Sequence, residues 1–166
     1  MNEEKALHIL KSAILLEKKG EVFYQKVADQ SKIPDVRKFF QDMADDEKQH
    51  VAALKAQFEF YQKHKKFDPE INQELLSSVA DEVLNPKLKE LIESASYEAA
   101  AISAAIDFEK KAVELYGHRA KEASDPEERK LFSWLSEWEQ GHLDAIVKLD
   151  EQLQEKVWFD NGFWPS

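Results

Sequence analysis

The segment Ala13-Ile14-Leu15-Leu16-Glu17-Lys18-Lys19 returns 92 residues later as Ala105-Ile106-Asp107-Phe108-Glu109-Lys110-Lys111. The same offset relates Glu47-Lys48-Gln49-His50 to Glu139-Gln140-Gly141-His142, so residues 13–54 and 105–146 form an internal repeat without a gap. In each copy, a Glu is followed 30 residues later by a Glu-x-x-His motif. The repeat predicts two helical hairpins that face each other, each of which contributes half of one site.

Four long helices are indicated by apolar residues that recur every three or four positions in both copies of the repeat. Pro34 and Pro126 suit the first turn of a helix, and Asp125 stands where a side chain can cap the helix that follows. Because only short turns separate the first helix from the second and the third from the fourth, each pair is expected to be an antiparallel hairpin. The expected helices cover residues 4–30, 34–65, 96–123 and 126–157.

Two segments lie outside these helices. Residues 66–95 contain Asp68-Pro69 and Asn85-Pro86, and we expect a long crossover there with short helices at 71–83 and 87–92. The aromatic tail at residues 157–166 is expected to be non-helical and to cover the core of its own chain, with a dimer partner as the alternative surface that it would cover. The sequence therefore predicts an all-α protein with one domain over residues 1–166, an antiparallel bundle of two hairpins joined by the crossover.

The composition excludes several classes of function. The 166 residues include no Cys, which excludes disulfides, thiol nucleophiles, thiolate zinc sites and iron–sulfur clusters. The net charge of −10 argues against partners such as nucleic acid or an anionic membrane surface. We expect a soluble cytoplasmic protein, because neither a secretory signal nor an apolar stretch that could span a bilayer is visible.

Four glutamates lie within apolar stripes near the middle of the expected helices. The stripe of the second helix contains Glu47 and His50, and that of the fourth helix contains Glu139 and His142. Because the two residues of each pair are three positions apart, they lie on one face of their helix. The first helix has an inward stripe of Leu7, Leu10, Ile14, Glu17, Glu21 and Tyr24. The third helix has an inward stripe of Ile102, Ile106, Glu109, Val113 and Tyr116.

Four converging carboxylates need a source of positive charge. A buried carboxylate costs several kcal/mol unless it is compensated, and these stripes contain no Lys or Arg at the level of the glutamates. Two divalent cations would balance four carboxylates, and two neutral imidazoles would fill further coordination positions. One Glu from each of two helices with Glu-x-x-His from each of the others is the ligand pattern of dinuclear carboxylate bundles. The predicted metal ligands are Glu17, Glu47, His50, Glu109, Glu139 and His142.

The same residues carry a resemblance to a known family. Both copies of the repeat resemble the rubrerythrin branch of the ferritin-like superfamily. The matching residues are Ala13 to Tyr24 with Glu47 and His50 in the first copy, and Ala105 to Tyr116 with Glu139 and His142 in the second. The resemblance covers all four helices. It implies a ferritin-like bundle with a carboxylate-bridged pair of Fe ions, for which Mn or a mixed Mn/Fe pair is an alternative.

The resemblance also implies roles for the ligands and a class of reaction. Glu47 and Glu139 would be the bridging carboxylates, while Glu17 and Glu109 would be terminal ligands. The expected activity is that of an oxidoreductase which reduces hydrogen peroxide, or which oxidises Fe(II) with O₂ or peroxide. Rubrerythrin itself carries a Cys-ligated rubredoxin iron, so this chain would need an external electron donor. His142 stands where rubrerythrin proper tends to have another carboxylate, which makes the implied ligand set closer to that of bacterioferritin.

Two other functions compete with this hypothesis. One is iron storage in a multi-subunit shell of the ferritin or bacterioferritin type, which native mass distinguishes from the small assembly, a homodimer, that we expect. The crossover, longer than in cage-forming ferritins, argues against a shell. The other is a structural bundle without metal, which elemental analysis would reveal.

Further candidates surround the six predicted ligands. Glu21, one turn from Glu17, would be a seventh ligand or a proton relay, or else a carboxylate that reaches solvent. Tyr24 and Tyr116 would each orient a ligating carboxylate through a hydrogen bond. Trp134 and Trp138 are expected to serve packing rather than electron transfer. Three histidines without a counterpart in the repeat are expected at the surface: His8, His64 and His118.

Overall fold

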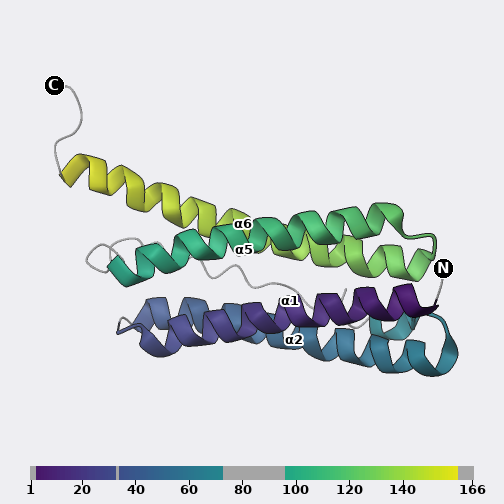
Figure 1. Cartoon of the computed structure of the whole chain (residues 1–166). Helices are drawn as coiled ribbons and strands as arrows, with labels where there is room; N and C mark the ends of the chain where they lie inside the picture. Colours follow the sequence, from purple (N-terminus) through teal and green to yellow (C-terminus); the bar gives the residue numbers. More distant parts are fainter. Residues whose placement is uncertain (1–2, 33, 73–95, 161–166) are drawn as a thin grey trace.

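Four long helices make up the computed structural model, which describes residues 3–32, 34–72 and 96–160. They are α1 (Glu3–Gln30), α2 (Pro34–His64), α5 (Ser96–Glu122) and α6 (Pro126–Asp160) (Figure 1). The first three end within one residue of the ranges expected from the sequence, and no strand occurs in the described residues. The all-α prediction is confirmed.

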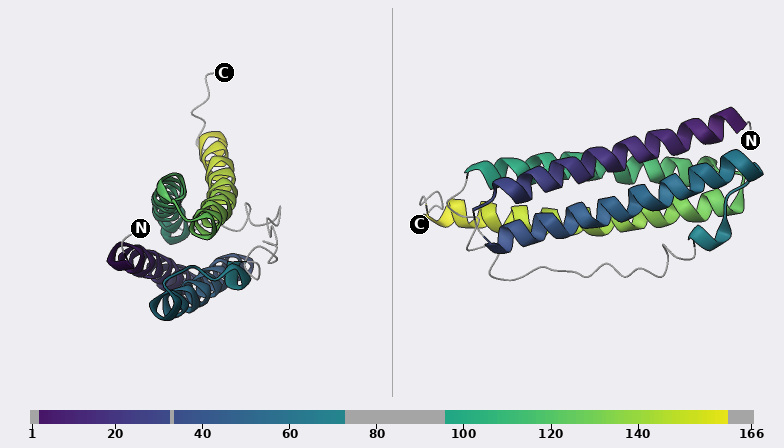
Figure 2. Two further views of the ribbon diagram at one scale, coloured as in Figure 1. Left: turned by 90° about the vertical axis from the view of Figure 1, so that its right-hand side faces the viewer. Right: turned by 90° about the horizontal axis from the view of Figure 1, so that it is seen from below.

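The helices are arranged as two antiparallel hairpins that lie one on the other. Figure 1 shows α1 with α2 in the lower layer and α5 with α6 in the upper layer, and the two views of Figure 2 show the same pairing. The two hairpins therefore face each other, as the repeat predicts.

The turns inside the two hairpins are held in the same way. Arg37 donates a hydrogen bond of 2.8 Å from Nη2 to the carbonyl of Ser31, at the end of α1. Its repeat counterpart Arg129 donates one of 2.8 Å to the carbonyl of Ala123, at the end of α5. Each Arg therefore satisfies a carbonyl that the preceding helix leaves free, which explains why both copies of the repeat have an Arg here.

The ends of α2 and α6 are also capped by specific contacts. Asp125 accepts hydrogen bonds from the backbone amides of Glu127 and Glu128, at 2.8 Å and 3.2 Å, which confirms it as the cap of α6. After α2 the chain turns at Lys65, whose φ of 58° lies in the left-handed region used at helix ends. Asn72 then donates to the carbonyl of Glu127 at 2.9 Å, so the start of the crossover is attached to the start of α6.

Two expectations on the outer segments need comment. Helix α6 continues to Asp160, so the prediction that residues 157–160 are non-helical was wrong. The residues that stop a helix come only later, at Asn161-Gly162 and Pro165, and nothing before them opposes helix propagation. Residues 69–72 are helical, and residues 71–72 are the described part of the segment 71–83 for which a short helix is expected. The rest of the crossover and residues 161–166 lie outside the described residues.

The core consists of two apolar clusters with a polar layer between them. One cluster contains Tyr24, Phe40, Ile102 and Ile146, and the other contains Leu10, Leu54, Tyr116, Phe132 and Leu135. Every one of these side chains is at most 1 % exposed. The six predicted metal ligands lie between the clusters, so apolar packing closes the polar layer from both ends of the bundle.

The buried face of α1 is rotated slightly from the stripe expected from the sequence. Small residues, Ala6, Ala13 and Gly20, are buried together with Leu10, Glu17 and Tyr24. Leu7, Ile14 and Glu21 are only partly buried, at the edge of the interface. Small side chains let α1 approach α5 closely, and Gly20 shows this most clearly. A Cβ there would lie 2.9 Å from the ring of Phe108 and 3.4 Å from Cδ of Glu47.

Gly20→Ala and Gly141→Ala should differ in their effect on stability. Replacing a helical Gly with Ala stabilises a helix by about 1 kcal/mol. Gly141 has no atom within 4 Å of an added Cβ, so Gly141→Ala should raise the free energy of unfolding by about that amount. Gly20→Ala should show no gain, because its Cβ would displace Phe108. Urea denaturation of the metal-free protein measures both, and equal gains would contradict the close approach.

Candidate metal centre

Six side chains from four helices meet in the polar layer. Two groups have ligand atoms that all lie within 4.8 Å of one another. The first group is Glu17, Glu47, His50 and Glu139, and the second is Glu47, Glu109, Glu139 and His142. The structure thus brings together all six residues that the sequence singled out, and Glu47 and Glu139 belong to both groups.

Glu47 and Glu139 each direct one oxygen to each histidine. For Glu47, Oε2 lies 3.4 Å from Nδ1 of His50 and Oε1 lies 3.5 Å from Nδ1 of His142. For Glu139, Oε1 lies 3.2 Å from Nδ1 of His50 and Oε2 lies 3.2 Å from Nδ1 of His142. Two carboxylates that present their oxygens to two separate imidazoles have the arrangement that bridging ligands need.

Glu17 and Glu109 each belong to one side of this arrangement. Oε2 of Glu17 lies 2.8 Å from Nδ1 of His50, and Oε1 of Glu109 lies 3.7 Å from Nδ1 of His142. Each side therefore has one unshared carboxylate and one imidazole, with both imidazoles presenting Nδ1. These positions match those of terminal ligands.

The centre contains polar atoms that the protein itself does not satisfy. Both oxygens of Glu47, both of Glu139, Oε2 of Glu109 and Nδ1 of His142 are buried without a hydrogen-bond partner among the described residues. Buried polar groups of proteins are normally paired, and an unpaired one is costly. Hard carboxylate oxygens with imidazole suit Fe or Mn. The donor set therefore fits two divalent cations.

Two tyrosines connect the hairpins at the level of the centre. The hydroxyl of Tyr24, on α1, donates to Oε1 of Glu109, on α5. The hydroxyl of Tyr116, on α5, donates to Oε1 of Glu17, on α1. The expected hydrogen bond from each tyrosine to a carboxylate of the centre is present. Each bond reaches the carboxylate of the opposite hairpin, so it both orients that carboxylate and links the two halves.

In the metal-free protein, bound protons can compensate the negative charge of the buried carboxylates. Burial, with the charges of Glu47 and Glu139, raises the pKa of Glu17 well above its ordinary value. Burial and the charge of Glu139 do the same to the pKa of Glu109. Both shifts favour the protonated, neutral form of the carboxyl.

The pKa values of the two histidines are also raised, whereas those of the shared carboxylates Glu47 and Glu139 are lowered. Burial alone would lower the pKa of His50, but its contacts with Glu139, Glu17 and Glu47 raise the pKa well above its ordinary value. The pKa of His142 rises similarly through Asp46, Glu109 and Glu139. Although burial opposes it, contacts with both histidines lower the pKa of Glu47 and of Glu139. These shifts favour protonated imidazoles beside ionised Glu47 and Glu139 in the metal-free protein.

Glu21 is not among the grouped ligands. Its carboxylate pairs with Lys18 at 2.8 Å, and its side chain is 18 % exposed. It lies at the edge of the interface because Gly20, rather than Glu21, faces α5. The structure therefore matches the alternative interpretation, a carboxylate that reaches solvent. The three histidines expected at the surface, His8, His64 and His118, are exposed.

Residues around the histidines include one that the sequence interpretation missed. Asp46 lies 3.1 Å from Nε2 of His142. Trp134 and Trp138 pack edge-on against the ring of His50, each with a centroid distance of 5.4 Å. Asp46 precedes a ligand and its position in the repeat corresponds to Trp138, a difference between the copies that could have identified it.

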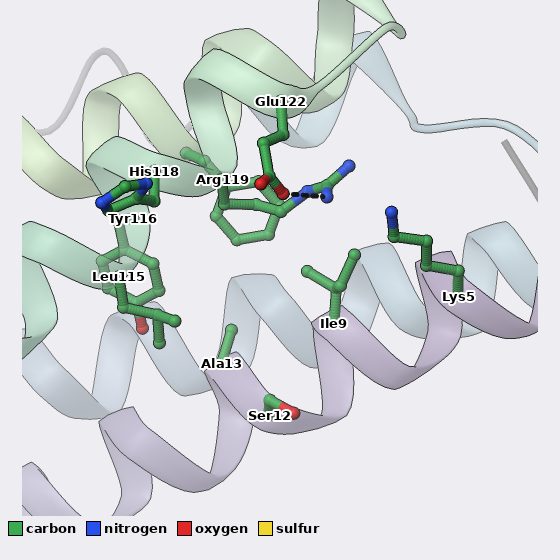
Figure 3. Close-up of a pocket in the computed structure, with 10 residues that line it drawn as sticks. Lys5, Ile9, Ser12, Ala13, Leu115, Tyr116, His118, Arg119 and Glu122 are labelled. Carbon is green, nitrogen blue, oxygen red and sulfur yellow. Dashed lines mark hydrogen bonds and ion pairs between the residues drawn. The ribbon is translucent and has the colours of Figure 1, made fainter.

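A surface cavity of about 260 Å³ lies between α1 and α5 near the centre. Figure 3 shows Tyr116 among the residues that line it, with Lys5 and the ion pair of Arg119 with Glu122 toward one end. The ring of Tyr116 is thus part of the cavity wall, while its hydroxyl bonds Glu17. Among the described residues, Tyr116 thus both lines this cavity and donates a hydrogen bond to a carboxylate of the centre.

Comparison with known proteins gives one match. The family model described as rubrerythrin matches residues 8–150, which include all six grouped residues. No curated protein and no solved structure matches the chain. None of the described helices is long and apolar enough to cross a membrane.

The metal-free protein should become less stable as pH rises from about 5.5 to 8. Groups with a raised pKa stabilise the fold at low pH and lose that contribution as pH rises through their folded pKa. For Glu17 and Glu109 this loss of stability begins above pH 4.5, their ordinary pKa. For His50 and His142 it begins above pH 6.5. The lowered pKa values of Glu47 and Glu139 change the stability only in acid, below pH 4.5, and so do not affect this range.

Urea unfolding of chelator-treated protein across this pH range measures the effect. The slope is at most about 1.4 kcal/mol per pH unit for each proton that only the folded state retains. Glu21→Gln is the matched control and should leave the slope unchanged, because the Glu21 carboxylate is in a surface ion pair. A stability that increases over the range would show that the centre does not hold these protons.

Proposed function

The chain belongs to the rubrerythrin family, and we propose that its buried carboxylates and histidines bind two Fe ions and form an oxidoreductase that reduces hydrogen peroxide. The observation that carries this proposal is the division of the oxygens of Glu47 and Glu139 between His50 and His142. Two ions held side by side by shared carboxylates can deliver two electrons to one O–O bond. Reduction of one peroxide to two water molecules takes up those two electrons and two protons.

The protein residues would hold the ions and control the surroundings. Glu47 and Glu139 would be ligands shared by both metal positions. Glu17 and His50 would complete one metal position, and Glu109 and His142 would complete the other. Tyr24 and Tyr116 keep one oxygen of each terminal carboxylate oriented by a hydrogen bond from the other hairpin. This preorganisation is expected to limit movement of the terminal ligands when the charge of the ions changes.

The route for a small oxidant is suggested by differences in exposure. The four glutamates and His50 are at most 1 % exposed, whereas His142 is 8 % exposed. The apolar clusters above and below the centre exclude water along the bundle axis. Peroxide is therefore proposed to approach from the side of His142. Because the chain has no Cys for a rubredoxin-type iron, electrons would come from an external donor.

Glu47→Gln or Glu139→Gln should reduce the bound metal from about two Fe per chain to at most one. The amide keeps the size of the side chain but loses the charge and one of the two oxygens that bridging needs. Elemental analysis after Fe(II) loading and removal of excess metal measures the ratio. Glu21→Gln is the control and should retain both ions. Two bound ions in either bridging variant would refute the assignment.

Peroxide should oxidise about two Fe(II) per molecule consumed in the loaded protein. Anaerobic titration with hydrogen peroxide, followed by the near-ultraviolet absorbance of Fe(III), gives this ratio, and a spin trap reports any hydroxyl radical. The paired ions should give the two-electron ratio without trapped radical, and Glu139→Gln should lose it. A ratio near one with abundant radical would instead indicate separate ions that react independently.

A further inference from the structure

The two copies of the repeat differ at the position that contacts the histidine of the other hairpin. In the first copy this position is Asp46, which lies 3.1 Å from Nε2 of His142. In the second copy it is Trp138, whose ring packs edge-on against His50 with a centroid distance of 5.4 Å. Each residue directly precedes a Glu of the centre. The outer sides of the two histidines are therefore chemically different.

His142 has an acceptor for its outer nitrogen. Its Nδ1 faces Glu47, Glu109 and Glu139. When Nδ1 of a neutral imidazole binds a cation, the ring proton is on Nε2. In that tautomer Nε2–H donates to Asp46.

Trp138 presents a competing contact to the same nitrogen. Its indole N–H lies 3.2 Å from Nε2 of His142, and a hydrogen bond there would require a lone pair on Nε2. Coordination through Nδ1 removes that possibility, because Nε2 then carries the proton. Metal binding on this side thus selects the hydrogen bond to Asp46.

His50 lacks such an acceptor among the described residues. Its Nε2 is buried without a hydrogen-bond partner. The neighbours of the ring are instead the indoles of Trp134 and Trp138, which lie nearly perpendicular to it. When Nδ1 of His50 binds a cation, the N–H on Nε2 therefore has no acceptor among the described residues, and an unpaired buried donor is unfavourable.

We propose that the two metal positions have unequal affinity, and that Asp46 is the positioning residue that makes the Glu109–His142 position the tighter one. The inference rests on the proposed dinuclear site. Partners that orient a ligating histidine typically contribute 10–100-fold to metal affinity, so a difference of about that size is expected. The greater exposure of His142, 8 % against 1 % for His50, also makes this position the first that an ion reaches from solvent.

Titration of the metal-free protein with Co(II), followed by calorimetry and by visible absorption of the bound ion, tests the proposal. The wild type should bind two ions in separate steps that differ by about 10–100-fold in affinity. Asp46→Leu should weaken the tighter step by a similar factor and bring the two steps together. Asp42→Asn is the matched control, because Asp42 lies one turn earlier on α2 and pairs with Lys38 instead.

Single-position variants assign the steps to the two histidines. In a His50→Ala background, which leaves the His142 position, Asp46→Leu should still weaken Co(II) binding. In a His142→Ala background the same change should have little effect, because its histidine partner is gone. A merely structural role of Asp46 would weaken binding in both backgrounds, and circular dichroism of each metal-free variant checks the fold.

The possible outcomes separate this inference from the proposed function. Equal affinities in the wild type, or steps that Asp46→Leu leaves unchanged, would overturn the inference while the dinuclear site stands. Absence of Co(II) binding in the wild type would overturn both. Trp138→Asp provides the converse test, since a carboxylate there would give His50 the acceptor it lacks, and the weaker step should tighten.

Discussion

Burial of four carboxylates at one level of the bundle is the constraint on which the remaining features depend. A buried charge costs several kcal/mol unless it is compensated, and the ion-pair partners of Glu17, Glu47, Glu109 and Glu139 among the described residues are the two histidines. The same bundle contains another buried carboxylate, Glu128, that is compensated differently: one oxygen accepts a 2.7 Å hydrogen bond from Nε of Arg119. Since the sequence supplies Arg near Glu128 and none in the central layer, the centre is suited to a removable source of positive charge, either protons or metal ions.

Much of the fold and the six grouped residues could be predicted because the repeat provides an internal comparison. A single Glu-x-x-His on a helix has little meaning, but two copies at the same distance from a preceding Glu select six residues from many acidic ones. Periodicity located the helices well because breakers are few. It failed at the end of α6, where aromatic residues suggested a tail although no residue before Asn161 opposes a helix.

Finer details depend on how helices pack, which periodicity does not specify. The stripe of α1 was expected to include Glu21, but the approach of α5 is set by the small residues Ala13 and Gly20, and this rotation leaves Glu21 at the edge. The tyrosines were expected to bond carboxylates, yet the helix to which each hydroxyl reaches follows only from the arrangement of the hairpins. Asp46 escaped notice because its partner His142 is 96 residues away in the chain.

The crossed tyrosine bonds have a consequence for how such a protein can originate. One hairpin alone has two carboxylates, one imidazole and a tyrosine whose acceptor is in the other hairpin. A chain of half this length would therefore need to pair with an identical copy, around a two-fold axis, to build the complete centre. Fusion of the copies into one chain removes the requirement for identity. Each half can then mutate separately, and the occurrence of Asp46 in one half and Trp138 in the other is a difference that a symmetric pair could not have.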